Sequence, residues 1–280
     1  DGYLARFDTT GQRIWCSYVG GSAIDICIEV RMLPSGGLVV SGSTRSSNFP
    51  VTAGAFQSTF GGITDAFLMR FDLNGNRLWG TFIGTTVGDW NTGLSINRTG
   101  GVVLGFGTES TSFPTTAGTY RSTWTPGAID AFEGVVMEFD TLGSRRWGSY
   151  FGGGAIDDIT SIDVDALNRI YITGRTTSSN LPTTPSSLQP SLNASPVFYD
   201  AFVARLSPTG GLDWCTYYGG SGAELPTSLF ALPNGTSQIV GLSNSTDLIR
   251  SRSPFQGTFG GGSYDAFVLE LDSSGSLLSD

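Results

Sequence analysis

The chain has 280 residues, of which only 14% are charged, and its net charge is −9 because 24 acidic side chains outnumber 15 basic ones. An acidic chain lacks the basic surface that binds nucleic acid or an anionic membrane, and no apolar stretch reaches the roughly 18 residues of a membrane span, so we expect neither nucleic-acid binding nor membrane insertion. The absence of His removes the commonest general base and transition-metal ligand, and three Cys residues are too few for a thiol-rich zinc site.

The glycine content, 40 of 280 residues, favours many short strands joined by tight turns over helices. The chain opens at Asp1, without Met and already inside a repeated pattern. We therefore expect a processed or excised piece of a longer precursor.

The first expected strands are residues 1–8 (DGYLARFD) and 13–20 (RIWCSYVG). After a glycine corner come an alternating strand at 28–33 (IEVRML) and a short apolar strand at 37–42 (GLVVSG). A long connection at 49–57 (FPVTAGAFQ) leads into the next copy of the same pattern. The first unit therefore predicts four strands and no helix.

The same order of elements recurs along the whole chain. Aligned on an Asp-Ala-Phe tripeptide, the units start at Asp1 (as DGY), Asp65, Asp130, Asp200 and, truncated, Asp265. The units span about 1–64, 65–129, 130–199 and 200–264, with an extra strand at 265–280. A Trp recurs in the second strand of each full unit: Trp15, Trp79, Trp147 and Trp214.

Four antiparallel strands per repeat, repeated four times, predict an all-β protein. The expected architecture is a single β-propeller domain over residues 1–280, with four blades of four antiparallel strands. One blade of this size cannot bury both of its faces, so we expect the recurrent Trp side chains to pack between blades.

The motifs resemble a known family. DAFVxxLxxxGxxxWxTYxGG, an alternating strand, YxTG and FPTTxGxxQ occur in order, most clearly at 169–184 (RIYITGRTTSSNLPTT) and 112–121 (SFPTTAGTYR). This pattern is similar to the bacterial beta-propeller repeats called SBBP repeats. The resemblance implies a secreted or cell-surface propeller, and it brings no common catalytic residues.

An acidic residue follows each glycine corner just before the alternating strand; these residues are Asp25, Asp89, Asp157 and Glu224. If that strand is innermost, the four carboxylates would ring one mouth of a central channel and hold a cation such as Ca²⁺. The alternative, which we favour, is that each carboxylate accepts backbone N–H bonds from its own corner.

Two further features have structural interpretations. The Asp-x-x-Gly stretches at Asp8–Gly11, Asp72–Gly75 and Asp140–Gly143 lack the acidic spacing of a calcium loop and are typical of hairpin turns. Cys16 and Cys215 share one repeat position, which predicts a small buried residue there, although a Cys16–Cys27 disulfide is also open.

No acid pair stands out from the repeats, so an enzyme is not expected and no cofactor is predicted. A structural or adhesive scaffold outside the cell is favoured. The alternative is a propeller that binds carbohydrate or another surface ligand through loop aromatics, with Trp90, Trp124, Phe198 and Tyr199 as the candidates.

The repeats leave one strand surplus. The strands at Asp1–Asp8 and Asp265–Asp272 would compete for one place in a fourth blade. We expect self-association, with Asp265–Asp272 pairing with the exposed edge of the next molecule in a head-to-tail filament. The expected contact residues are Asp1, Tyr3, Asp265, Phe267, Val268, Leu269 and Leu271. The alternatives are that this strand begins a further domain or covers an edge of its own ring.

Overall fold

The structure, a computed structural model, describes residues 1–124, 132–193, 198–250 and 255–278. These residues form seventeen strands and no helix, which confirms the all-β prediction. Accordingly, the described residues contain no helix that could cross a membrane. The strands are β1 (Gly2–Phe7), β2 (Arg13–Val19), β3 (Asp25–Met32), β4 (Leu38–Thr44), β5 (Asp65–Phe71), β6 (Arg77–Ile83), β7 (Asp89–Ile96), β8 (Val102–Thr108), β9 (Glu133–Phe139), β10 (Arg145–Phe151), β11 (Asp157–Val164), β12 (Ile170–Thr176), β13 (Asp200–Leu206), β14 (Leu212–Tyr218), β15 (Glu224–Ala231), β16 (Ser237–Ser243) and β17 (Asp265–Leu271).

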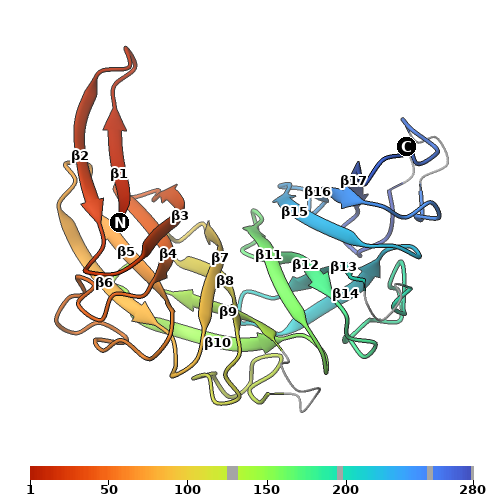
Figure 1. Ribbon diagram of the computed structural model, residues 1–280, viewed down its shortest axis with the longest axis horizontal. Helices are drawn as coiled ribbons and strands as arrows, with labels where there is room; N and C mark the ends of the chain where they lie inside the picture. The colour runs from red at the N-terminus through yellow and green to blue at the C-terminus, as the bar shows by residue number, and fades with distance from the viewer. Residues whose placement is uncertain (125–131, 194–197, 251–254, 279–280) are drawn as a thin grey trace.

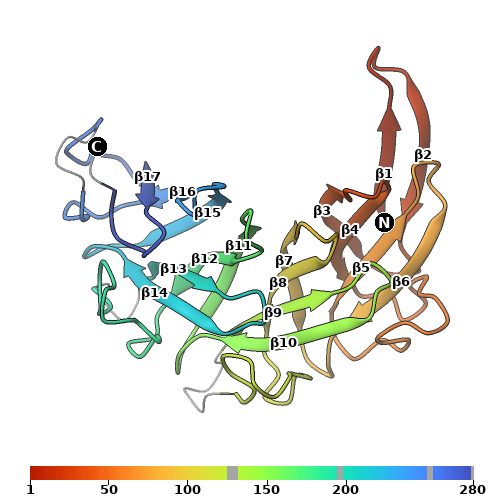
Figure 2. The same cartoon turned by 180° about the vertical axis from the view of Figure 1, so that it is seen from behind.

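The described strands form five antiparallel sheets. Three are complete four-stranded blades, β3–β6, β7–β10 and β11–β14. The two terminal sheets are smaller, because β1 pairs only with β2 and the last sheet holds β15, β16 and β17. The sheets follow one another along an open arc, with the β1–β2 hairpin and the β15–β17 sheet at its opposite ends (Figures 1 and 2).

The alternating strand is the innermost strand of each blade (Figure 1). Within each complete blade, the order from this strand outward follows the chain order. The inner strands β3, β7, β11 and β15 face their neighbours around the inside of the arc. For example, the Ser95 hydroxyl on β7 donates to the Asp163 carboxylate on β11 at 2.9 Å.

One unit starts three residues later than the tripeptide alignment places it. Asp65 pairs with Thr44 and Asp200 pairs with Thr176, and in the same register Glu133 pairs with Thr108. Glu133 therefore occupies the position of Asp65 and Asp200. Asp130, the start suggested by the Asp-Ala-Phe tripeptide, lies outside the described residues.

Each core lies between two adjacent blades. Val136 from the β7–β10 blade, for example, shares one buried cluster with Ile172 and Phe202 of the next blade. Burying these faces is the main stabilising contribution, because a sheet of this size has no other layer against which to pack.

The recurrent Trp side chains lie between adjacent sheets and bond each sheet to the next, which confirms their predicted position between blades. Each indole N–H donates to a backbone carbonyl in the hairpin turn of the following sheet: Trp15 to Leu73 at 3.0 Å, Trp79 to Thr141 at 3.1 Å, Trp147 to Pro208 at 3.2 Å and Trp214 to Ser273 at 3.2 Å. The turn glycine lies directly against the indole, and a Cβ on Gly210 would be 2.8 Å from the Trp147 ring.

The Asp-x-x-Gly stretches are hairpin turns, as predicted. In the first, the Asp8 carboxylate accepts hydrogen bonds from the backbone N–H groups of Thr10 and Gln12 at 2.8 and 2.9 Å. Gly11, Gly75 and Gly143 have φ values of +82°, +85° and +84°, a conformation in which Gly carries no steric penalty.

Candidate functional site

The corners between blades contain the candidate acidic residues. Each of the four accepts a hydrogen bond from a backbone N–H of its own corner: Asp25 from Gly21 at 2.7 Å, Asp89 from Thr85 at 2.6 Å, Asp157 from Gly153 at 2.6 Å and Glu224 from Gly220 at 3.0 Å. Their other carboxylate oxygens accept hydrogen bonds from the hydroxyls of Thr44, Thr108, Thr176 and Ser243. The favoured interpretation, in which each acid holds its own corner, agrees with these contacts.

A second acidic side chain approaches each corner from the neighbouring strand. A Cβ on Gly20 would lie 2.6 Å from the Asp1 carboxylate and 2.6 Å from the Asp25 carboxylate. In the next blade a Cβ on Gly84 would lie 2.5 Å from Asp65. Glycine therefore suits the corner position, because a Cβ there would come within 3 Å of at least one carboxylate.

Burial raises the pKa of three acids at these corners, Asp65, Asp89 and Asp157. It raises the pKa of Asp65 to about 6, and the nearby Asp89 carboxylate contributes to this rise. Burial also raises the pKa values of Asp89 and Asp157, while the hydroxyl and N–H donors of each corner oppose the rise. The cause is removal of the carboxylates from water, not a ring of four acids acting on one another.

Stability should therefore depend on pH through Asp65. The folded state holds the Asp65 proton more tightly than the unfolded chain, so the free energy of unfolding should fall as pH rises from about 4 to about 6. Asp65→Asn should remove part of this fall, because the Asn side chain does not titrate. Its amide oxygen can still accept from the Gly61 N–H, which lies 2.8 Å from the Asp65 carboxylate. Urea titrations at a series of pH values measure the slope.

The matched control for this pH dependence is Asp72→Asn. Asp72 lies in an exposed turn, and hydrogen bonds from Asn76 lower its pKa. Asp72→Asn should leave the fall between pH 4 and pH 6 in place. A wild-type stability that rises over this range, or a fall that is unchanged in Asp65→Asn, would contradict the assignment to Asp65.

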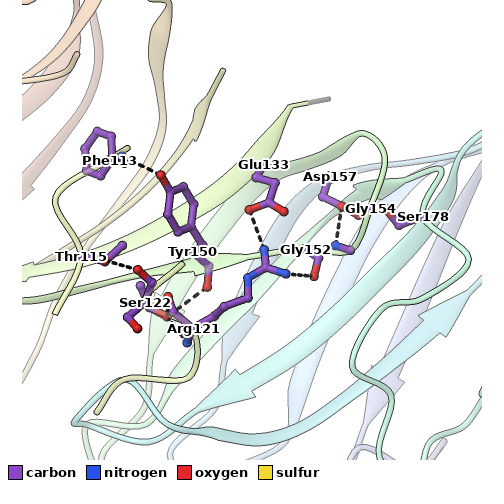
Figure 3. Close-up of polar contacts among 12 residues, drawn as sticks. Phe113, Thr115, Arg121, Ser122, Glu133, Tyr150, Gly152, Gly154, Asp157 and Ser178 are labelled. Atoms are coloured by element: carbon purple, nitrogen blue, oxygen red, sulfur yellow. Dashed lines mark hydrogen bonds and ion pairs between the residues drawn. The ribbon is translucent and has the colours of Figure 1, made fainter. Parts of the chain in front are cut away.

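The corner between β10 and β11 differs from the others because it contains an ion pair (Figure 3). The Arg121 guanidinium lies 2.6 Å from the Glu133 carboxylate, which is fully buried, and its Nη1 donates to the Gly152 carbonyl at 2.7 Å. In the preceding blade Gln57 occupies the place of Arg121 and donates to Asp65 at 3.1 Å.

The backbone of the corner changes with the side chain. Gln57 Oε1 accepts from the Gly84 N–H at 2.9 Å, whereas Arg121 has no acceptor and binds a carbonyl instead. The corner at Gly152 has a φ of +155°, which side-chain-bearing residues rarely adopt. Arg121, Glu133 and Gly152 therefore differ together from Gln57, Asp65 and Gly84, their counterparts in the preceding blade.

Sequence reasoning missed a polar contact that joins three blades. Asp163 on β11 accepts from the Ser95 hydroxyl on β7 at 2.9 Å and from the Ala231 N–H on β15 at 2.9 Å. Arg31 stands at the equivalent position of β3. The one signal for this contact in the sequence was an acidic residue, Asp163, within the alternating strand.

The described residues contain no group of three or more Asp, Glu, Cys or His side chains positioned to hold a metal ion. Calcium takes six to eight oxygen ligands. At the Asp25 corner both carboxylate oxygens already accept hydrogen bonds from the protein, including one from Ser46 at 2.9 Å. The corner acids therefore do not support a calcium site.

The candidate ligand-binding aromatics make contacts within the protein. Trp90 stacks near Phe132 with 5.5 Å between ring centroids, and Trp124 meets Tyr150 edge-on at 5.7 Å. The Arg175 guanidinium lies over the Tyr199 ring at 5.0 Å. Phe198 is 39% exposed, and the other three candidates are half-buried. These contacts do not favour a glycan-stacking surface.

All three cysteines are free thiols in this structure. Cys215 is fully buried, which confirms the predicted small buried position in that blade. Cys16, at the equivalent place on β2, is exposed because β2 belongs to the terminal two-stranded sheet.

The terminal residues are arranged differently from the expected donation of residues 265–272. β17 pairs along its whole length with β16 of its own sheet, and Phe267, Leu269 and Leu271 are buried there. Tyr3 on β1 and Val268 on β17 are 68% and 74% exposed. Within this molecule β17 thus covers an edge of its own sheet, which was one of the alternatives.

Four-stranded antiparallel blades that share cores with their neighbours and radiate from inner strands define the architecture of a β-propeller repeat protein. The family comparison agrees: residues 146–182 match the family model of the SBBP beta-propeller repeat. The match begins on β10, passes through the Asp157 corner and ends in the following connection. The SBBP resemblance is thereby confirmed.

Two other comparisons find similar proteins. The chain is 28% identical over 260 residues to the regulatory protein FlaEY of Caulobacter vibrioides, covering 86% of this chain and 26% of that protein. The chain therefore spans about a quarter of this curated relative. A solved protein of unknown function from Bacteroides caccae is 13% identical, with coverage of 96% of this chain and 85% of that one and a TM-score of 0.44.

Proposed function

We propose that the protein is a non-enzymatic structural or adhesive scaffold outside the cell, which self-associates head to tail through its terminal strands. The observation that carries the proposal is the pair of incomplete sheets, with two and three strands, that flanks three complete blades. Both terminal sheets present apolar side chains to solvent. Exposed apolar sheet faces of this kind mark interaction surfaces.

The chain in this proposal contributes four blades as one domain. Three are complete, and the fourth is a composite of strands from the two terminal sheets. The buried acids described above support a non-enzymatic role, because their oxygens accept hydrogen bonds that fix corners and blades. The extracellular location rests on the resemblance to SBBP repeats.

Self-association can be tested by light scattering and electron microscopy of residues 1–280 over a range of concentrations. We expect oligomers that grow with concentration. Val30→Asp, on the open face of β3 where Val30 is 45% exposed, should abolish them. Leu142→Asp, at a hairpin turn where Leu142 is 76% exposed, should leave them intact. A wild-type chain that stays monomeric at high concentration would refute the proposal.

A further inference from the structure

A cavity of about 290 Å³ lies at the interface between the β7–β10 blade and the β11–β14 blade. Glu138 and Trp147 line it from the first blade, and Pro208 and Thr209 line it from the β13–β14 hairpin turn of the second. Both blades are complete and lie inside the arc, so the cavity does not arise at an end of the chain (Figure 1).

At the other interfaces an Arg guanidinium occupies the equivalent place. Each of these arginines pairs across its hairpin with the recurrent Trp. Each donates to the same turn carbonyl as the indole N–H does: Arg6 to Leu73 at 2.5 Å, Arg70 to Thr141 at 2.5 Å and Arg205 to Ser273. The Arg205 guanidinium also lies over the Trp214 ring, 5.9 Å from its centroid. The turn carbonyl beside a Trp is therefore a place for a guanidinium in this fold.

Two smaller side chains open the cavity. Glu138 stands where the other hairpins carry Arg, because it pairs with Trp147 in the same register. Val103, the second residue of β8, stands where β12 carries Tyr171. The buried Tyr171 ring meets Trp214 edge-on at 6.2 Å in the following interface. Both differences remove side-chain volume beside the indole, which leaves space for a guest.

The cavity wall carries a buried carboxylate. The Glu138 side chain is 5% exposed, and its Oε1 accepts from the Asn97 amide at 2.8 Å and from Arg146 at 3.0 Å. Its Oε2 accepts from the Trp147 indole N–H at 2.8 Å, and the same N–H lies 3.2 Å from the Pro208 carbonyl. Glu138 Oε2 and the Pro208 carbonyl thus share a single indole donor.

We propose that this cavity binds a guanidinium group, carried by a small compound or by an Arg side chain of a peptide. The guanidinium donates to Glu138 Oε2 and to the Pro208 carbonyl and lies against Trp147, as Arg205 does against Trp214. Its forked N–H groups suit two neighbouring acceptors, and its flat face suits an indole. An ammonium group offers neither feature.

Arg146 is the competing cation within the chain. It reaches Glu138 Oε1 from the rim, where its side chain is 47% exposed. Leu78 holds the equivalent place, directly before Trp79, in the preceding blade. Arg146→Leu should therefore tighten guanidinium binding about tenfold, because the buried carboxylate loses one charged donor. An affinity that does not increase would show that the guanidinium does not pair with Glu138 and would overturn the proposal.

Calorimetric titration of residues 1–280 with n-butylguanidinium at pH 7 tests the site, and n-butylurea is the uncharged probe of the same shape. Butylguanidinium should bind saturably, about tenfold more tightly than butylurea. The blocked peptide Gly-Arg-Gly distinguishes the two sources. Its binding assigns the site to an Arg side chain as well, and binding of butylguanidinium alone assigns it to a free compound. No saturable binding of either cation, or equal affinity for butylurea, would refute the proposal.

Thr209→Phe should abolish binding without opening the core, because Thr209 is exposed and lines the cavity. Leu142→Phe is the matched control. Leu142 precedes the turn glycine of β9–β10 as Thr209 precedes that of β13–β14, but at its interface Arg70 already donates to the turn carbonyl. Binding by Leu142→Phe should equal that of the wild type. Equal binding by Thr209→Phe would place the guanidinium elsewhere.

The internal repeat also supplies a variant that fills the cavity from within. Glu138→Arg combined with Arg146→Asp recreates the pair that Arg205 and Asp213 form at 2.9 Å in the next blade. This double variant should not bind butylguanidinium, because its own guanidinium takes the place. Circular dichroism checks that it folds, and a folded double variant that binds as the wild type does would overturn the assignment.

Discussion

Arg121→Met should lower the free energy of unfolding by about 3–5 kcal/mol, because it leaves a buried carboxylate without its cation. Glu133 is fully buried, and the guanidinium 2.6 Å away is its ion-pair partner. The same substitution removes the donor to the Gly152 carbonyl. Urea unfolding at pH 7, with the m-value checked for two-state behaviour, measures the loss.

The internal repeat supplies both a rescue and a control. Arg121→Gln combined with Glu133→Asp recreates the pair that Gln189 and Asp200 form in the next blade and should recover most of the lost stability. Gln57→Met removes an uncharged donor to the Asp65 carboxylate in the preceding blade and should have a smaller effect, about 1–3 kcal/mol. Equal losses from Arg121→Met and Gln57→Met would show that the buried charge at Glu133 is not the cause.

Much of the fold follows from the sequence because the repeat applies the same physical requirement several times. The recurrent Trp, the turn glycine and the alternating strand occur in every full unit, so each predicts a contact that all blades share. The structure places them accordingly, with Trp214 reaching the turn of the next sheet and β11 innermost in its blade. Periodic features of this kind are predictable from one sequence.

Features that occur in one repeat only were not predictable. An Asp-Ala-Phe tripeptide at 130–132 resembles the start of a unit, yet the register depends on hydrophobic faces and places Glu133 there. From the sequence alone, Arg121 is expected to be a solvent-exposed cation. Its burial depends on the ion pair with Glu133, twelve residues away. Asp163 joins strands from three blades, and the spacing within one unit carries no information on such contacts.

The open arc could not be read from the repeat either. A count of strands fits a chain closed by its own ends as well as one completed by a partner, since both use the same side chains. The difference lies in the relative angle of neighbouring sheets, which depends on side-chain volumes at every blade-to-blade core.

Gly210→Ala should destabilise the protein by about 2–5 kcal/mol, more than the conformational strain alone. Gly210 has a φ of +81°, and an Ala in that left-handed conformation costs about 1–2 kcal/mol. Its new Cβ would also lie 2.8 Å from the buried Trp147 ring, so the indole must shift. Displacing a packed core group adds about 1–3 kcal/mol.

Gly11→Ala isolates the strain. Gly11 has nearly the same φ, +82°, in the equivalent turn of the β1–β2 hairpin, but within the described part of the chain a Cβ there would have no neighbour within 4 Å. Its effect on the unfolding free energy should therefore be confined to about 1–2 kcal/mol. Urea titrations of both variants give the difference, and near-UV circular dichroism should change only in Gly210→Ala, because only there does an indole move. Equal losses in the two variants would mean that the turn position needs glycine for its backbone conformation alone. The close approach of the turn to the Trp indole would then make no contribution of its own.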